Sequence, residues 1–559
     1  MRRRDLLYNM AAVCLGLPRL VRGQLLPRGS QEAASGTGSR DLARASSRQR
    51  KWQDLEFGMF VHFAPNTWQD VESDNLSTPL SAINPAKLDT DQWVNTALTL
   101  GARYIVFVAK HQGGFCMWQT RTTDYGIRNT PWKGGKGDVL AEIAASCRKH
   151  GLGLGVYVCP RDDHFGAGTG GVCKTPELQH KYNAMYREQL SEVFSRYGEL
   201  VEIWFDGSTV TSVGDLLQRY QPNAMVFQGP QATIRWVGNE DGFAPYPCWN
   251  GISAAEAKTG VATALDSDPN GEVWLPNEVD VSIRRPDWFW SATNVKKVLS
   301  VDQLLSIYYR SVGRGAQLLL NIPADRDGLL PQPDCGVAAA FGKEVLRRFG
   351  RAVASTHGSG SSLVLTLDSP SRVDTVVLEE QIELGERVRS YKIDGKVDGK
   401  WMLLGEGTAI GHKRIQPVPP RLLDAVRLTV TESAGDPAIR TFAVFDTGVS
   451  PPEDWDAATT LWAPDLVGQW VNGVFAIDLT KGIRVAGQYS LRFCPERGAV
   501  TGIRDVVLEL GGVSEASLVR ASPSKKNELV LDITGLDRSV HVRGNVEGAE
   551  AGSILLERR

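Results

Sequence analysis

The feature that most constrains the fold is a regular alternation of strand and helix patterns between Trp52 and about Gly350. Short apolar runs predict strands, and longer amphipathic stretches between them predict helices. The expected strands cover residues 57–63, 104–110, 154–160, 200–206, 224–228 and 317–323. The expected helices cover residues 91–100, 138–150, 175–197, 213–220 and 301–312. Alternation over about 300 residues indicates parallel strands joined by helices.

Two architectures contain such a sheet. A (β/α)8-type barrel is the simplest closed form. The alternative is an open, doubly wound sheet, which normally carries a glycine-rich phosphate loop after its first strand. Gly151, Gly153 and Gly155 come before and within a strand, so they do not form such a loop. We therefore expect a catalytic barrel over residues 51–350.

The pattern changes after about Arg351 to short alternating runs between Gly, Pro and Asp turns. These runs predict a β-sandwich over residues 351–450 and an additional β-rich domain over residues 451–559. A chain of 559 residues is long enough for about three domains. The apolar fraction of 42% and the net charge of −2 indicate a globular protein without an electrostatic case for binding nucleic acid or an anionic membrane surface.

The first 30 residues resemble an export signal. Three arginines, Arg2 to Arg4, precede an apolar stretch, residues 6–17, that is too short to cross a bilayer. This arrangement is similar to a twin-arginine signal and predicts a periplasmic or extracellular protein. The alternative is a disordered basic N-terminus. Residues 31–50 are rich in Ser, Gly, Ala and Arg and predict a linker, and no later stretch resembles a membrane span.

Polar side chains collect where the barrel strands are expected to end. The clearest case is Asp206, which follows the apolar run 200–205 and precedes a glycine. An aspartate there points out of the carboxyl end of the barrel, where the active sites of such barrels lie. The alternative is that Asp206 only shapes the turn. Further polar residues in such positions are His62, Lys110, His111, Asp162, His164, Glu240 and Glu278.

Carboxylates, histidines and tryptophans on one rim suit glycoside hydrolysis, which needs two carboxylates across the scissile bond. The 15 tryptophans either belong to the core or stack on the apolar faces of sugar rings. A lone histidine on such a rim has the simpler alternative of an ordinary hydrogen-bonding residue. The eight cysteines contain no C-x-x-C pair and the histidines no His-x-His pair, so we expect no metal and no cofactor.

Several separate motifs, in order, resemble the α-L-fucosidases of glycoside hydrolase family 29. They are Phe57-Gly-Met-Phe-Val-His62, Ala109-Lys-His111, Phe115-Cys-Met-Trp118, Asp124-Tyr125, Trp204-Phe-Asp206-Gly207 and Leu318-Leu-Leu-Asn321. Three more stretches resemble the subgroup that acts on α-1,3/1,4-linked fucose. These are Arg235-Trp-Val-Gly-Asn-Glu240, Trp274-Leu-Pro-Asn-Glu-Val-Asp-Val-Ser-Ile-Arg284 and Ser311-Val-Gly-Arg314. The resemblance covers residues 52–450.

The resemblance implies a retaining exo-α-L-fucosidase that acts on fucosylated oligosaccharides or glycoconjugates. Asp206 matches the family nucleophile and Glu240 the acid/base of the subgroup, with carboxyl groups about 5–6 Å apart. Glu278 competes for the acid/base role, or it forms a structural ion pair with Arg284. The residues implied to bind substrate are His62, Glu72, His111, Trp118, Tyr157, Trp204, Arg235, Glu278 and Trp288.

The chain departs from the family at positions that line the expected cleft. Gln112 and Gly113 follow His111, where the family usually has a histidine and an aspartate. Arg161 stands where the subgroup usually has tryptophan, and the segment between Asp206 and Glu240 is shorter than usual. An alternative function therefore stays open: a carbohydrate-binding protein, or a glycosidase of altered specificity, on the same scaffold with little fucosidase activity.

Overall fold

The structure is a computed structural model of the chain. It describes residues 42–456, 465–479, 487–495, 499–510, 513–514, 519–521, 526–533 and 540–558. The signal-like segment, residues 1–30, and the first part of the expected linker lie outside the described residues. Described structure begins just before the short helix α2 (Ser47–Gln53).

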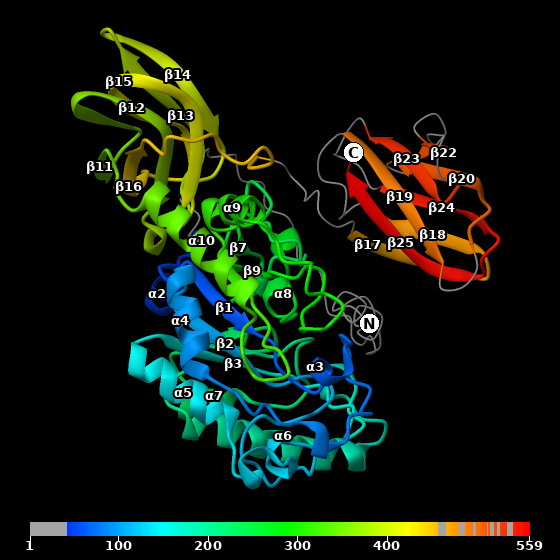
Figure 1. The fold of residues 1–559 in the computed structure, drawn as a ribbon. Helices are drawn as coiled ribbons and strands as arrows, with labels where there is room; N and C mark the ends of the chain where they lie inside the picture. The colour runs from blue at the N-terminus through cyan, green and yellow to red at the C-terminus, as the bar shows by residue number, and fades with distance from the viewer. Residues whose placement is uncertain are drawn as a thin grey trace, which may run out of the picture.

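Eight parallel strands form a nearly closed barrel (Figure 1). In chain order they are β1 (Phe57–Val61), β2 (Tyr104–Lys110), β3 (Gly153–Val158), β4 (Glu202–Trp204), β5 (Met225–Phe227), β6 (Arg235–Trp236), β9 (Asn277–Ser282) and β10 (Gln317–Asn321). Each strand pairs with the next in this order except β5 with β6, and β10 pairs with β1. A parallel bridge between Phe227 and Ile234 joins β5 to the segment entering β6. The predicted barrel is therefore confirmed.

Helices lie on the outside of this barrel (Figure 1). They are α4 (Thr90–Leu100), α5 (Val139–His150), α6 (Pro176–Arg196), α7 (Gly214–Tyr220), α9 (Val301–Arg310) and α10 (Gln332–Phe349). Side-chain caps explain where several of them begin, because Asp89, Asp138, Thr175 and Ser300 each accept a hydrogen bond from a backbone N–H of the first turn. Each helix that the structure describes is too short or too polar to span a bilayer.

Two connections depart from the strand–helix pattern. β5 leads to β6 through residues 228–234, which form a turn. The long connection from β6 to β9 carries the short elements β7 (Gly251–Ile252), α8 (Ala254–Ala257) and β8 (Val273–Trp274). The sequence pattern did not single out β6 or β9 as strands. β6 has only two residues, and β9 carries Glu278 and Asp280, which hide its apolar character.

The next domain is one antiparallel sheet of six strands. They are β11 (Ala354–Ser359), β12 (Ser362–Glu380), β13 (Val388–Val397), β14 (Lys400–Gly407), β15 (Arg414–Ser433) and β16 (Ala438–Phe445). The longest of these strands are β12 and β15. The pairing of β12 with β15 shifts register between Thr366 and Ser371, and such a shift bends a strand. The sheet thereby encloses a core of its own, which includes Tyr391, Ile393 and Phe442.

The described residues after 464 form a second antiparallel sheet with its own core. Its strands are β17 (Asp465–Val471), β18 (Val474–Asp478), β19 (Gly487–Pro495), β20 (Gly502–Leu510), β21 (Val513–Ser514), β22 (Val519–Ala521), β23 (Glu528–Ile533), β24 (Val540–Glu547) and β25 (Ala551–Arg558). Trp470, Phe475 and Phe493 belong to that core, and the ring of Phe493 contacts the rings of the other two. These strands agree with the β-rich module that the sequence predicts.

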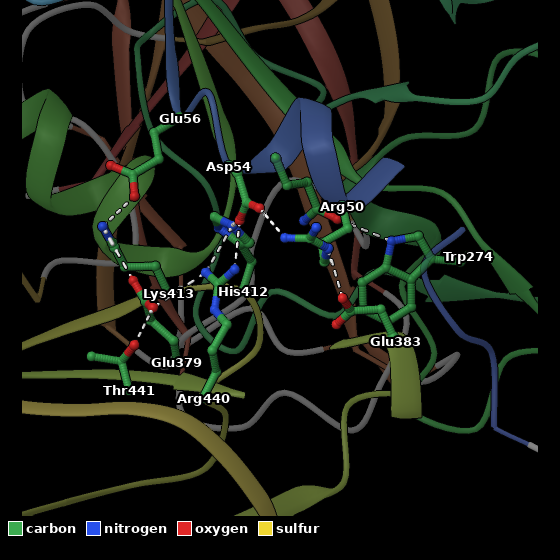
Figure 2. A network of polar contacts seen from close by, with 11 residues as sticks. Arg50, Asp54, Glu56, Trp274, Glu379, Glu383, His412, Lys413, Arg440 and Thr441 are labelled. Atoms are coloured by element: carbon green, nitrogen blue, oxygen red, sulfur yellow. Dashed lines mark hydrogen bonds and ion pairs between the residues drawn. The ribbon is translucent and has the colours of Figure 1, made fainter. Parts of the chain in front are cut away.

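An ion-pair network joins the barrel to the six-stranded domain (Figure 2). Its charged members are Arg50, Asp54, Glu56, Glu379, Glu383, His412, Lys413 and Arg440. Asp54 lies at its centre, because Oδ1 contacts His412 Nε2 at 3.0 Å and accepts from Arg440 Nη1 at 2.6 Å. Asp54 and Glu56 directly precede β1. The network therefore lies at the amino ends of the barrel strands, opposite the expected site.

The variant Asp54→Asn tests this network. Burial alone would raise the pKa of Asp54, but hydrogen bonds from His412 and Arg440 outweigh it and hold the pKa well below its ordinary value. Such a carboxylate stabilises the folded state above its unfolded pKa, about 4, and this contribution is lost as the pH falls further. We expect Asp54→Asn to lower the free energy of unfolding by about 1–2 kcal/mol at neutral pH, and by progressively less below about pH 4.

Urea unfolding across this pH range measures the difference. Asp327→Asn is the matched control, because Asp327 forms an exposed pair with Lys87 at 2.9 Å whose loss should change the free energy of unfolding little. Equal effects of the two variants would show that the Asp54 network contributes no more than a surface ion pair.

Candidate active site

Asp206 lies two residues beyond β4, at the carboxyl end of the barrel. Its side chain is largely buried, and its Oδ2 accepts a hydrogen bond from Tyr157 Oη at 2.7 Å. The turn that follows has positive φ at Gly207, and the backbone N–H of Gly207 donates to Gln228 Oε1 at 2.8 Å. Gln228 thus supports the turn, while the carboxylate of Asp206 accepts from the hydroxyl of Tyr157, a residue of β3.

Glu240 follows β6 by four residues and is also largely buried. Its Oε2 accepts from Trp288 Nε1 at 3.2 Å. Its Oε1 is buried, and within the part of the chain that the structure describes it has no hydrogen-bond partner. Burying an unpaired carboxylate oxygen costs free energy, so such an atom commonly marks the place of a ligand. Trp288 lies on the connection after β9, which brings two distant parts of the chain together.

Glu72 holds the other side of the Trp288 segment. Its Oε2 accepts from the backbone N–H of Trp288 at 2.8 Å, and its Oε1 lies 3.5 Å from the backbone nitrogen of Phe289. Burial raises the pKa of Glu72 to about 7; these amides oppose that shift, and the charges of Asp287 and Glu240 add to it. Trp288 therefore lies between two carboxyl groups.

His62 connects the surroundings of the two candidate catalytic carboxylates. Its ring centre lies 6.1 Å from that of Tyr157, which binds Asp206, and 5.0 Å from that of Trp288, which binds Glu240. His62 Nδ1 lies 2.8 Å from Asn321 Oδ1. Asn321 Nδ2 donates to the Trp288 carbonyl, so its oxygen is the acceptor and His62 Nδ1 the donor. The His62 ring is thereby held in one orientation.

Further rings complete this group. His111 stacks on Tyr157 with ring centres 5.6 Å apart, and it contacts Phe289 at 5.0 Å. Trp204 lies 6.1 Å from Tyr157 and 5.1 Å from Phe60. Of the residues singled out from the sequence, the structure connects Asp206, Glu240, His62, Glu72, His111, Tyr157, Trp204 and Trp288.

Phe60, Phe289 and the supporting Asn321 were not among the site residues chosen from the sequence. Asn321 ends the buried strand β10 just as Asp206 follows β4, so a polar residue closing an apolar strand was the available signal. Phe60 and Phe289 carried no such signal, because a phenylalanine in a pocket wall looks like any core residue.

Glu278 lies at the other end of the barrel. It is fully buried near the start of β9, where Tyr104 Oη, at the first residue of β2, lies 3.5 Å from its Oε2. Burial and the carboxylate of Glu202, the first residue of β4, raise the pKa of Glu278 well above its ordinary value. Glu202 accepts hydrogen bonds from the indoles of Trp52 and Trp204. We therefore expect Glu278 to be protonated and to donate to Glu202.

Two arginines singled out from the sequence have structural partners. Arg284 forms a buried two-point ion pair with Asp334, at 2.7 and 2.8 Å, and not with Glu278. Arg235 donates to the carbonyls of Trp249 and Thr263, and burial lowers its pKa to about 10. Arg235 therefore anchors the connection after β6.

Trp118 is fully buried and donates its indole N–H to Glu192 of α6 at 2.9 Å. Among the described residues, no ring contact joins Trp118 to His62, His111, Tyr157, Trp204 or Trp288.

The departure at Gly113 has a spatial explanation. A Cβ atom at this position would lie 2.1 Å from Asp74 Oδ2, so the carboxylate of Asp74 fills the space of a side chain there. Asp74 is held by Tyr125 Oη at 2.7 Å and by Gln69 Nε2 at 2.7 Å. The chain thus places a carboxylate beside Gly113 from a different position in the sequence.

The departures at Gln112 and Arg161 lie together. Arg161 forms a two-point ion pair with Asp163, at 2.7 and 2.9 Å, and its Nη1 lies 3.5 Å from Gln112 Oε1. The backbone N–H of Asp163 donates to the Gln112 carbonyl at 2.9 Å. These residues present an amide and a guanidinium next to His111.

A separate cavity of about 660 Å³ lies beside the β2–α5 connection. It is lined by residues of the segment 121–129, by Asp162, His164 and Phe165, and by Met185 of α6. Neither Asp206 nor Glu240 lines it. Among the described residues, no three or more His, Cys, Asp or Glu side chains gather in a way that suits a metal ion.

Known proteins with similar sequences and structures fall in one family. The family model described as alpha-L-fucosidase matches residues 79–345. Alpha-L-fucosidase 1 of Arabidopsis thaliana is 33% identical over 452 residues, which are 71% of this chain and 86% of that protein. A glycoside hydrolase 29 family member from an unknown rumen bacterium is 25% identical, with a TM-score of 0.66 over 93% of this chain and 100% of that one. A Ruminococcus gnavus family 29 fucosidase in complex with fucose is 25% identical, with a TM-score of 0.65 over 76% of this chain and 98% of that one.

Substitution of the two buried glutamates separates their roles. Glu278→Gln keeps a donor to Glu202, so we expect the free energy of unfolding at neutral pH to change by less than about 1 kcal/mol. Glu202→Gln weakens the acceptor of two buried indole N–H groups and should cost about 2–4 kcal/mol. A carboxyl with a raised pKa stabilises the fold below its unfolded pKa, and this contribution is lost as the pH rises through the folded pKa.

The stability of the wild type should therefore decline on the alkaline side more steeply than that of Glu278→Gln. Urea unfolding between neutral and alkaline pH measures both effects. A larger loss for Glu278→Gln than for Glu202→Gln would reverse the assigned donor and acceptor.

Proposed function

We propose that this chain, which belongs to the α-L-fucosidase family of glycoside hydrolases, is a retaining exo-α-L-fucosidase acting on α-1,3/1,4-linked fucose of glycans. The observation that carries the proposal is the pair Asp206 and Glu240. One has its carboxylate fixed by Tyr157, and the other has one oxygen bound by Trp288 and one buried oxygen without a partner among the described residues. Retaining hydrolysis needs this division between a fixed nucleophile and an acid that reaches the leaving oxygen.

In the first step the Asp206 carboxylate attacks the anomeric carbon of the fucosyl group. The bond from that carbon to the glycosidic oxygen breaks, and the protonated Glu240 gives its proton to this oxygen. In the second step Glu240, now a carboxylate, takes a proton from water. The water oxygen attacks the anomeric carbon and Asp206 leaves as a carboxylate. Two inversions at one carbon give a product of retained configuration.

The rings around His62 support fucose as the sugar. Fucose carries a methyl group and several hydroxyl groups, so its pocket needs an apolar wall and a few polar groups. Phe60, Trp204 and Phe289 supply apolar surface, and His62 and His111 supply ring nitrogens. The Ruminococcus gnavus relative, whose structure holds fucose, also supports this choice. The motif from Arg235 to Glu240 supports the α-1,3/1,4 linkage.

The second candidate is a glycosidase of altered specificity on the same scaffold. It is favoured by Gln112 and Arg161, which lie together beside His111 and differ from the family pattern. Asp74 supports the first candidate, because it supplies a carboxylate where Gly113 has no side chain. Assays on aryl α-L-fucosides, aryl α-galactosides and α-1,3/1,4-fucosylated oligosaccharides separate the two. Preferential cleavage of a sugar other than fucose would favour the second.

We also propose that the protein is exported to the periplasm or the extracellular space. The support is the arginine cluster and short apolar stretch at the start of the chain. Fractionation of cells that express the full chain, compared with a variant in which Arg2 to Arg4 are changed to Lys, tests the location.

Substitution of the two carboxylates should give different kinetic losses. Asp206→Ala should remove nearly all activity on every substrate, because no covalent fucosyl-enzyme forms. Any azide rescue should give a fucosyl azide of inverted configuration. Glu240→Ala should lose about 10²–10⁴-fold in kcat/KM on glycans but much less on aryl fucosides with good leaving groups, which need little protonation. Azide should restore turnover of this variant with retained configuration.

Glu278→Gln is the matched control, since Glu278 lies at the opposite end of the barrel and should retain near wild-type kcat/KM on both substrate classes. Initial rates and NMR of the products measure all three variants. Near wild-type turnover by Asp206→Ala would overturn the nucleophile assignment. A loss confined to poor leaving groups in Glu278→Gln would transfer the acid/base role to that residue.

A further inference from the structure

The segment that follows the six-stranded domain returns to the barrel. Residues 451–456 lie after β16, and Asp454 Oδ2 accepts from Arg310 Nη1, at the end of α9, at 2.9 Å. The carbonyl of Trp455 accepts from Arg314 Nη2 at 3.0 Å. The side chain of Trp455 packs against the barrel core. This segment is therefore fixed to the barrel by a charge, a hydrogen bond and an apolar contact.

The same two arginines hold the loop that carries Glu240. The backbone N–H of Ala244 donates to the Arg310 carbonyl at 2.7 Å, and Arg314 Nη1 donates to the Ala244 carbonyl at 2.6 Å. The guanidinium of Arg310 also lies 4.8 Å from the centre of the Phe243 ring. Both backbone groups of Ala244 thus bond to residues that the 451–456 segment contacts.

Short contacts carry this restraint along residues 239–244. Asn239 Nδ2 donates to the Phe243 carbonyl at 2.9 Å, and Asn239 Oδ1 accepts from the backbone N–H of Asp241 at 3.0 Å. Gly242 packs so closely against α9 that a Cβ atom there would lie 2.7 Å from a side chain of that helix. A movement of the end of α9 would therefore move this loop.

Asp454 supplies a negative charge next to the two buried arginines, Arg310 and Arg314. Burial lowers the pKa of Arg310, and Asp454 opposes that shift. Burial lowers the pKa of Arg314 to about 9, and repulsion from Arg310 and Arg414 adds to the effect. Without this carboxylate, the buried Arg310 would lose its ion pair and keep only the weaker influence of Asp241 and Asp456 beside a second cation, so the end of α9 would have to adjust.

We propose that Asp454 is a positioning residue, which acts through Arg310 and Arg314 to set the loop 239–244 and with it the carboxyl group of Glu240. The inference rests on the proposed function, because it takes Glu240 as the acid/base. Proton transfer by Glu240 would then depend on residues 451–456, which follow the six-stranded domain.

Kinetics of the full chain test the proposal with Asp454→Ala, Asp454→Asn and Asp454→Glu. A misplaced general acid forfeits part of its 10²–10⁴-fold contribution, so the first two variants should lose about 10–100-fold in kcat/KM on fucosylated glycans. They should lose less than about 3-fold on aryl fucosides with good leaving groups, with KM nearly unchanged. Asp454→Glu keeps the charge and should recover most of the loss. If Asp454→Ala does not fold, Asp454→Asn, which keeps the side-chain shape, decides.

Asp215→Ala is the matched control, because Asp215 pairs with Arg187 on the outer surface at 2.6 Å, away from the loop. It should leave both substrate classes unchanged. Equal losses of an Asp454 variant on both classes, or no loss, would overturn the proposal. Glu240→Ala, measured in parallel, shows whether the dependence of the loss on the leaving group arises at Glu240. If Glu240→Ala shows no such dependence, the proposed function fails together with this inference. If Glu240→Ala shows the dependence and the Asp454 variants do not, only the inference fails.

Discussion

The closure of the eight parallel strands into a ring is the constraint on which the rest of the structure depends. In the sheet order, β5 and β6 are the two outer strands, and the bridge between Phe227 and Ile234 joins them. Asp206 follows β4, the neighbour of β5, and Glu240 follows β6. In an open sheet these carboxylates would lie at opposite edges. The ring brings them to one rim, and the parallel direction of every strand adds His62 and Asn321 to the same rim.

Two pairs of acidic residues in one barrel illustrate how position sets the chemistry of a carboxyl group. Glu202 and Glu278 lie at the amino ends of their strands, fully buried and close to indole and phenol groups, and burial raises the pKa of both. Asp206 and Glu240 lie at the carboxyl ends, where Asp206 accepts from Tyr157 of β3 and Glu240 accepts from Trp288 of the connection after β9. The first pair fills the interior of the barrel, and the second lies at the rim, where we propose that the substrate binds. Trp204 connects the two ends, because its indole donates to Glu202 while its ring lies near Tyr157.

The sequence predicted the features that depend on residues close together in the chain. Apolar periodicity placed the five expected helices within about two residues of their observed ends, and a polar residue following an apolar run marked Asp206. The sequence did not predict contacts between residues far apart in the chain. Nothing near Glu278 in the chain indicates that Tyr104 and Glu202 surround it, and the polar pattern that these partners permit hid β9 as a strand. Arg235 belongs to a substrate-binding motif by resemblance, yet its partners are carbonyls of the following connection.

The contact between Gly113 and Asp74 restricts how a chain like this one can diverge. Because a Cβ atom at position 113 would lie 2.1 Å from the carboxylate of Asp74, a larger residue enters there only if position 74 becomes small first. A small residue at position 74 on its own would leave a hollow beside Gly113 and leave the hydroxyl of Tyr125 without its present acceptor. A carboxylate at position 113 and the present carboxylate of Asp74 would therefore compete for the same space, so a single substitution at either position either clashes or removes the charge.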